Sequence, residues 1–312
     1  MTHTTIVHDA AQIVVGPPST LAGSDYADAA ETDTEDTLAY FQDAALVAED
    51  GTVVAVGPSE EVTRDYRLED ADTVVDGSGQ AVIPGFVDSH THALFAGDRS
   101  DEFAAKLRGK AYQEILAEGG GILRTVRAVR EAGDEQLLSN LLGHLDEMLA
   151  HGSTTVEVKS GYGLDTETEL RMLDVIQRAD EQHPIDVVPT FMGAHAVPEE
   201  WDAESYTEEV VEDQIPAVAE QGVAEFVDVF CEADVFSVEQ SRRVLESGAA
   251  AGLTPKVHAE EFVHLGGAQL AAEVGAASAD HLLHADEADA RALAHAGVVP
   301  VFLPATAFSL GA

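Results

Sequence analysis

The sequence has few cysteines, lysines and aromatic residues, and it lacks any long apolar run. It contains one cysteine, Cys231, in 312 residues, which excludes an internal disulfide and a zinc site built from several cysteines. No segment approaches the roughly 20 apolar residues that a membrane-spanning helix needs. Residues 1–5 include no lysine or arginine, so the N-terminus does not resemble a secretory signal. We therefore expect a cytoplasmic protein that binds no membrane.

Positive charge is also scarce, because 16 Lys and Arg residues stand against 58 Asp and Glu residues, a formal net charge of −42. Such a charge repels phosphate backbones, so we expect no nucleic-acid partner. The acidic residues are spread along the whole chain, which does not fit an acidic tail. This self-repulsion destabilises a compact state unless salt screens it, and the composition therefore predicts a halophilic protein.

The pattern of apolar residues changes near residue 80. Residues 1–80 hold short apolar runs separated by turn sequences such as Glu49-Asp50-Gly51, which predicts a small N-terminal all-β domain. From residue 81 to 312, apolar strands alternate with amphipathic helices, which predicts parallel βα units. The expected strands are 81–87, 154–158, 186–190, 226–230, 255–258, 277–283 and 298–303. Seven strands fit either an open doubly wound sheet or a (β/α)8 TIM-type barrel whose eighth strand is missing.

Histidines occur at the ends of several of these strands. His90 and His92 follow the first strand with a spacing that puts both side chains on one face. Further histidines end the third, fifth and sixth strands, at His195, His258 and His281. A single histidine at a strand end is more often structural, but five at one barrel mouth indicate a metal site. Imidazole and carboxylate ligands suit Zn or Fe(II).

Several strings in this half of the chain resemble the imidazolonepropionases, a family of metal-dependent amidohydrolases. They are residues 84–99, 118–123, 159–164, 193–198, 228–232, 258–261, 265–268 and 278–282. The resemblance favours the barrel over the doubly wound sheet. It implies hydrolysis of the cyclic amide in 4-imidazolone-5-propanoate to N-formimidoyl-L-glutamate, in histidine degradation, with one Zn or Fe ion. It also implies a homodimer.

The resemblance implies His90, His92 and His258 as metal ligands. The family's fourth ligand is an aspartate after the eighth strand, and this residue would lie beyond residue 312. We therefore expect residues 1–312 alone to be inactive and prone to aggregate, and a longer natural chain to exist. Lys159 could in principle be a carbamylated bridge between two metals, but a family with one metal favours a structural lysine behind the ligands.

The resemblance also assigns residues to the substrate and to proton transfer. Glu261 would contact the substrate ring and move protons, and His281 would lie beside the reacting water. Arg99, Tyr162 and His195 would hold the substrate, with the Arg99 guanidinium on the propanoate. Either His195 or His281 could donate to the developing oxyanion. For Arg99, a surface ion pair with Asp101 or Glu102 is the alternative.

Two other functions fit the same residues. One is an amidohydrolase that acts on another ring, for example a deaminase. The other is a truncated relative without catalytic activity, which only binds its ligand or a partner subunit.

The charge predicts that stability depends on salt. We expect the melting temperature to rise steeply between low and molar KCl, because the Debye length shortens from about 10 Å at 0.1 M to about 3 Å at 1 M. Thermal melts followed by circular dichroism across this range make the measurement. A melting temperature that does not change with salt would contradict the halophilic interpretation.

Overall fold

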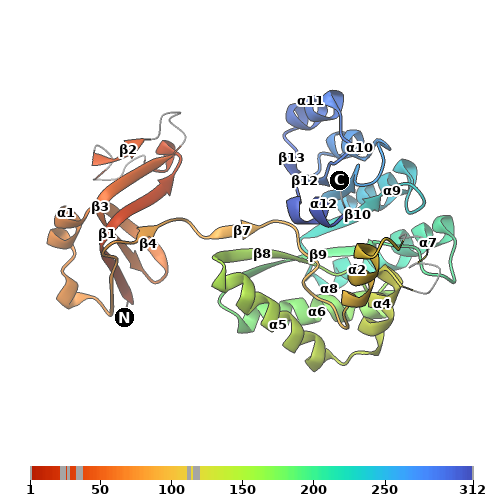
Figure 1. The fold of residues 1–312 in the computed structure, drawn as a ribbon, viewed down its shortest axis with the longest axis horizontal. Coiled ribbons are helices and arrows are strands. Elements are labelled where there is room, and N and C mark those ends of the chain that lie inside the picture. The colour runs from red at the N-terminus through yellow and green to blue at the C-terminus, as the bar shows by residue number, and fades with distance from the viewer. Residues whose placement is uncertain are drawn as a thin grey trace. The chain divides into compact units, whose positions relative to one another are not determined.

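The computed structural model describes residues 2–21, 26, 29–32, 38–110, 114 and 120–310. Two residues of the family-like string 118–123, Glu118 and Gly119, lie outside the described residues. The chain forms two compact units, Met1–Gly85 and Phe86–Ala312, both visible in Figure 1. In the described residues, every helix is too short or too polar to cross a membrane.

The first unit contains a six-stranded mixed sheet. β1 pairs antiparallel with β3 and parallel with β5 and β6, while β2 and β4 flank β3. The strands are β1 (Thr4–Gly16), β2 (Glu31–Thr32), β3 (Ala39–Glu49), β4 (Thr52–Pro58), β5 (Thr73–Asp76) and β6 (Ala81–Val82). β3 and β4 form the predicted hairpin. Its turn residues Asp50 and Gly51 both have positive φ, as the right-handed twist of a tight hairpin requires.

This unit is not purely β, which the sequence pattern did not predict. It also holds helix α1 (Ser59–Asp65) and the short 3-10 helices η1 (Pro18–Leu21) and η3 (Leu68–Asp70). Glu60 and Glu61 lie in the first turn of α1, where acidic side chains interact favourably with the helix dipole. Val62 is fully buried in the core of the unit, so the helix is held by packing.

The second unit is built on a seven-stranded parallel sheet in the order β13-β12-β11-β10-β9-β8-β7. The strands are β7 (Phe86–Asp88), β8 (Ser153–Lys159), β9 (Asp186–Ala194), β10 (Phe226–Cys231), β11 (Thr254–Ala259), β12 (Ser278–His281) and β13 (Val299–Val301). Each strand pairs with the next one in sequence, which is the connectivity of a (β/α) barrel. The predicted α/β barrel class, with seven strands, is confirmed.

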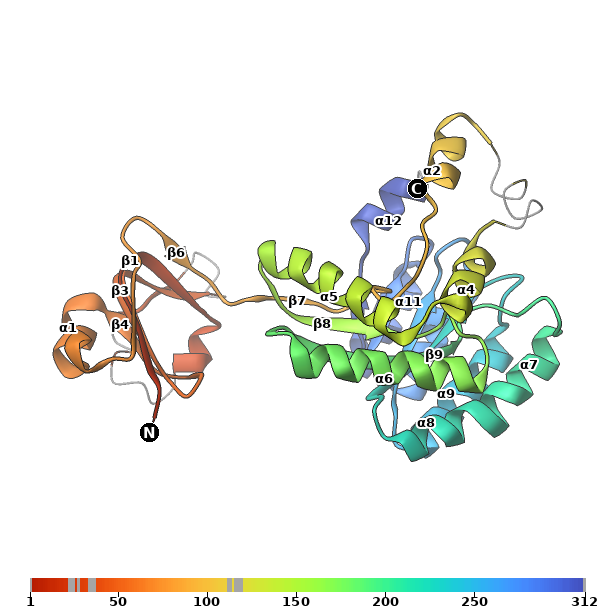
Figure 2. The same ribbon diagram turned by 90° about the horizontal axis from the view of Figure 1, so that it is seen from below.

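Most helices of this unit cover the outer face of the sheet, whereas α2 and α12 stand apart from that layer (Figures 1 and 2). The described helices are α2 (Ser100–Leu107), α4 (Ile122–Glu131), α5 (Asp134–Ala150), α6 (Thr166–Gln182), α7 (Ala203–Glu209), the π-helix η4 (Val210–Gln214), α8 (Ile215–Gln221), α9 (Val238–Ala250), α10 (Gly267–Val274), α11 (Glu287–Ala296) and α12 (Pro304–Leu310). In α5, Leu137, Leu141 and Leu145 recur every four residues and are fully buried. This apolar face packs α5 against the core of the unit, beside β8 and α6.

One predicted strand divides between the two units. Residues 81–87 were expected to form a single strand, but β6 pairs with β1 in the first unit, while β7 pairs with β8 in the second. Pro84 between them has no N–H to donate and Gly85 weakens a strand, which explains the break. The helix predicted over 208–220 is likewise divided, into the end of α7, η4 and α8.

Two helix glycines allow a matched test of the packing between helices and sheet. A Cβ on Gly248 in α9 would overlap the side chain of Val227 in β10, whereas one on Gly143 in α5 would meet open space. We expect Gly248→Ala to lower the free energy of unfolding by about 1–3 kcal/mol through overpacking. Gly143→Ala should raise it by up to about 1 kcal/mol through helix propensity. Urea titrations at molar KCl measure both, and shifts of the same sign would contradict the packing described here.

Candidate active site

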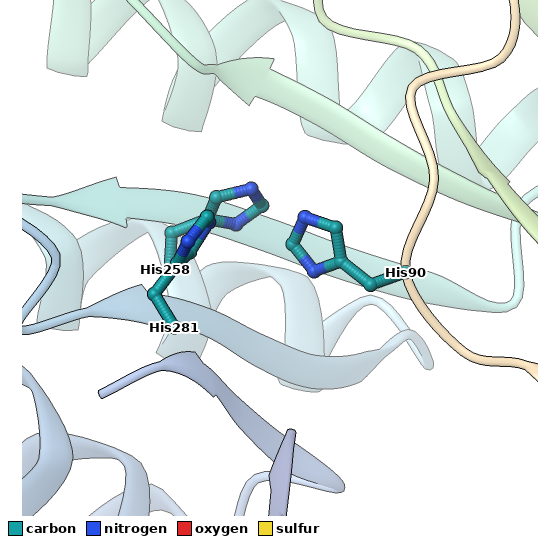
Figure 3. Close-up of side chains that lie close together, drawn as sticks. All are labelled: His90, His258 and His281. Atoms are coloured by element: carbon teal, nitrogen blue, oxygen red, sulfur yellow. The ribbon is translucent and has the colours of Figure 1, made fainter. Parts of the chain in front are cut away.

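The five predicted histidines gather at the C-terminal ends of the parallel strands. The ring centroid of His258 lies 4.5 Å from that of His90 and 5.1 Å from that of His281. His92 stacks on His195 with centroids 4.6 Å apart. Figure 3 shows the ring of His90 facing those of His258 and His281. Residues from four strand ends, far apart in sequence, therefore surround one point.

The nitrogen atoms of these rings suit a metal ion. Candidate ligand atoms of His90, His258 and His281 all lie within 4.8 Å of one another. His92 Nε2 lies 3.1 Å from His258 Nε2, and the buried His92 Nδ1 has no hydrogen-bond partner among the described residues. Burial holds the pKa of both His92 and His258 well below the usual value. Both rings are therefore neutral, which is the form that binds a metal.

Two carboxylates lie behind the histidines. Asp280 Oδ2 is 2.6 Å from His90 Nδ1, and Asp228 Oδ2 is 3.0 Å from His258 Nδ1. A carboxylate at Nδ1 retains the proton there and leaves Nε2 free to bind a metal, an arrangement that is common around metal-binding histidines. The sequence analysis did not assign either aspartate a role.

These aspartates belong to a group of five buried charged residues, which we call the charge cluster: Glu157, Lys159, Asp228, Lys256 and Asp280. Lys159 Nζ is 2.7 Å from Glu157 Oε1 and 2.7 Å from Asp228 Oδ2. Lys256 Nζ is 2.9 Å from Glu157 Oε1 and donates to the Ser89 carbonyl at 2.8 Å. Burial alone would lower the pKa of Lys159, but Asp228, Glu157 and Asp280 together raise it, so the lysine stays charged.

A second compact group of possible ligands, His90, Glu157 and Asp280, overlaps the charge cluster. The ammonium group of Lys256 lies beside two of its members, 2.9 Å from Glu157 and 3.9 Å from Asp280. The Lys256 ammonium group therefore already supplies the positive charge that a metal ion would supply beside these carboxylates. For this reason we assign the metal to the group of histidines.

Glu261 and His281 form an acid–base pair next to the histidines. Glu261 Oε1 lies 3.5 Å from His281 Nδ1. Burial, and then the nearby Glu232, raise the pKa of Glu261 to about 7. Burial and then His90 lower the pKa of His281 to about 4. At neutral pH, Glu261 can therefore gain or lose a proton, while His281 remains uncharged.

The backbone near this pair is strained. Glu260, His281 and Leu282 have φ angles of 54°, 76° and 57°, which non-glycine residues rarely adopt. Such strain is concentrated at functional sites in proteins.

Besides Glu261, three residues were predicted to bind the substrate, Arg99, Tyr162 and His195, and they lie next to the metal-site histidines. Arg99, Tyr162 and His92 line a cavity of about 370 Å³. Arg99 Nε also donates to Glu102 Oε2 at 3.0 Å, so the ion pair that we gave as an alternative does exist. The ring of Tyr162 lies 5.3 Å from that of His195, and burial raises the Tyr162 pKa to about 12. The phenol is therefore a neutral hydrogen-bond donor.

His195 is fixed by its backbone contact. Its Nδ1 lies 2.9 Å from the Gly161 carbonyl, and burial lowers its pKa to about 4. The proton must therefore be on Nδ1, and the neutral Nε2 can only accept a hydrogen bond. With its proton on Nδ1, His195 has no N–H to donate to an oxyanion, so this contact does not favour the donor role predicted for His195.

No protein-family model matches this chain, but two relatives share most of its sequence. An imidazolonepropionase of Haloarcula marismortui is 74% identical over 88% of this chain. One of Halobacterium salinarum is 63% identical over 98% of it. The chain belongs to the imidazolonepropionase family. It spans 66% of the length of the first relative and 70% of the second.

Solved structures with low sequence identity share the fold of this imidazolonepropionase-family chain. A guanine deaminase from C. acetobutylicum matches 99% of the chain with a TM-score of 0.62 at 14% identity. An atrazine chlorohydrolase from Arthrobacter aurescens, complexed with zinc and atraton, matches 98% with a TM-score of 0.63 at 13% identity. The chain covers 70% and 67% of these two structures. They support the amidohydrolase barrel fold.

Proposed function

We propose that this site hydrolyses 4-imidazolone-5-propanoate to N-formimidoyl-L-glutamate. The observation that carries the proposal is the gathering of neutral histidines, an acid–base pair and an arginine-lined cavity at one end of the sheet. The family to which the chain belongs supports the same substrate.

His90, His92 and His258 would hold a single Zn or Fe ion, as the resemblance implies. The three histidines whose candidate ligand atoms all lie within 4.8 Å of one another are His90, His258 and His281, so His281 is the alternative to His92 as the third ligand. His92 Nε2 and His258 Nε2 lie 3.1 Å apart, and the carboxylates of Asp280 and Asp228 contact Nδ1 of His90 and His258, which leaves Nε2 of each ring available to an ion. Such an ion supplies a Lewis acid that makes water nucleophilic at neutral pH.

Arg99 and Tyr162 would orient the substrate. A guanidinium matches the two oxygens of a carboxylate, so Arg99 would bind the propanoate arm in the cavity. The neutral phenol of Tyr162 would donate a hydrogen bond. His195, whose Nε2 accepts, would take a hydrogen bond from a ring N–H of the substrate.

Glu261 would move the protons that the reaction needs. Hydrolysis takes a proton from water and gives one to the departing ring nitrogen, and a carboxyl group with a pKa of about 7 can do both. His281, 3.5 Å from Glu261, would hold this carboxylate in place and hydrogen-bond the reacting water.

The first prediction from this assignment concerns Arg99. We expect Arg99→Met to raise the KM for 4-imidazolone-5-propanoate by about 10- to 150-fold, as losing a charged hydrogen bond of about 1.5–3 kcal/mol implies. Arg178→Met is the matched control, since Arg178 pairs with the exposed Glu135 and does not line the cavity. Steady-state kinetics on the longer natural chain expected above give both values, and an unchanged KM would remove Arg99 from the site.

The second prediction concerns Glu261. In the same longer chain, kcat should rise with pH through about 7, because proton removal from water requires the ionised carboxylate. We expect Glu261→Gln to lower kcat by about 10²- to 10⁴-fold and to abolish this rise. The exposed Glu220→Gln is the control. An unchanged pH profile in Glu261→Gln would assign the proton transfer to another group.

Two assays on the folded chain in molar KCl test the proposal as a whole. We expect imidazole-4-propanoate, which keeps the propanoate arm but has no ring carbonyl, to bind in a manner that depends on Arg99. Binding of the ring without preference for the carboxylate would contradict the proposed substrate. Turnover of 4-imidazolone-5-propanoate then separates a hydrolase from a protein that only binds, and turnover of aminopyrimidines instead would indicate a deaminase.

A further inference from the structure

The charge cluster is too costly to be incidental. Lys159, Asp228 and Asp280 are fully buried, and Glu157 and Lys256 are nearly so. Each buried charge costs several kcal/mol unless it is closely paired. Three carboxylates meet two ammonium groups, so the cluster retains a net charge of −1. None of the substrate-binding roles assigned above explains why Lys159 and Lys256 are buried here.

Lys159 connects the cluster to one metal ligand. Its Nζ contacts Asp228 Oδ2 at 2.7 Å, and the same oxygen lies 3.0 Å from His258 Nδ1. Asp228 Oδ1 lies 3.1 Å from this Nδ1 and also accepts from the Val229 amide at 2.7 Å. The Asp228 carboxylate therefore lies between an ammonium on one side and an imidazole on the other.

We propose that Lys159 is a positioning residue for His258, acting through Asp228, and that it thereby sets how tightly the site binds its metal ion. Without the ammonium, the buried Asp228 carboxylate has no full positive charge beside it and is held only by the Val229 amide and by His258. His258 then loses the contact that fixes its ring and keeps the proton on Nδ1. This inference rests on the metal site proposed above.

Lys159→Met tests this role, because methionine fills similar space without a charge. We expect Co²⁺, used as the probe, to bind about 10- to 100-fold more weakly, which is the usual effect of losing an outer partner of a ligand. The visible d–d absorption of bound Co²⁺ should also change. Lys110→Met, at a lysine outside the sheet strands, should change neither. A role limited to packing would lower the melting temperature and leave the affinity and the spectrum unchanged.

The double variant Lys159→Met/Asp228→Asn shows whether Lys159 acts through Asp228. It removes one charge of each sign, so the cluster keeps its net charge, and Glu157 keeps Lys256 as a partner. The asparagine oxygen can still accept from His258 Nδ1. We therefore expect the double variant to bind Co²⁺ within about threefold of the native chain, recovering the affinity that the single variant loses. If the single variant does not fold, near-native binding by the double variant still supports the proposal.

Three results would overturn it. Native affinity and spectrum in Lys159→Met would show that Lys159 does not position His258. Weak binding by the double variant would show that Lys159 does not act through Asp228. Failure of the native chain to bind Co²⁺ would contradict the metal site itself, and this inference with it. By contrast, native Co²⁺ binding without substrate binding would contradict only the proposed substrate.

Discussion

Pairing of charges inside the sheet is the constraint on which the rest of the site depends. Lys159 and Lys256 place two positive charges among three buried carboxylates, and two of those carboxylates, Asp228 and Asp280, contact Nδ1 of His258 and His90. The parallel strands bring these groups together because their C-terminal ends lie at one edge.

The same arrangement explains why the histidines are neutral and close together. Burial favours the uncharged form of His92, His195, His258 and His281, so four imidazoles can share a small space without repulsion. Around them, Glu261 has a pKa near neutrality and Arg99 lines the adjoining cavity. The outer surface is different, because its acidic groups lie in solvent, where dissolved salt can screen them.

Much of this arrangement could be predicted from the sequence. Regular alternation of apolar strands and amphipathic helices indicated the parallel sheet. Histidines at the ends of the strands indicated that the site lies at the C-terminal edge of that sheet. The break at Pro84 was missed because residues 81–87 form one apolar run, and such a run does not show that its two halves pair in different sheets. The charge cluster was missed too, although single charges inside apolar strands, such as Asp228 in Phe226–Cys231, were visible. Their pairing crosses strands, so it depends on register, which a single sequence does not specify.

The most direct measurement of the central claim is X-ray absorption spectroscopy of the chain loaded with Zn²⁺ in molar KCl, together with its metal content. The account predicts one ion per chain, with a first shell that contains at least three imidazole nitrogens at about 2.0–2.1 Å. A decrease of about one in the number of imidazole ligands in His258→Ala would identify His258 as one of them. A first shell of oxygen atoms alone, as surface carboxylates would give, would contradict it.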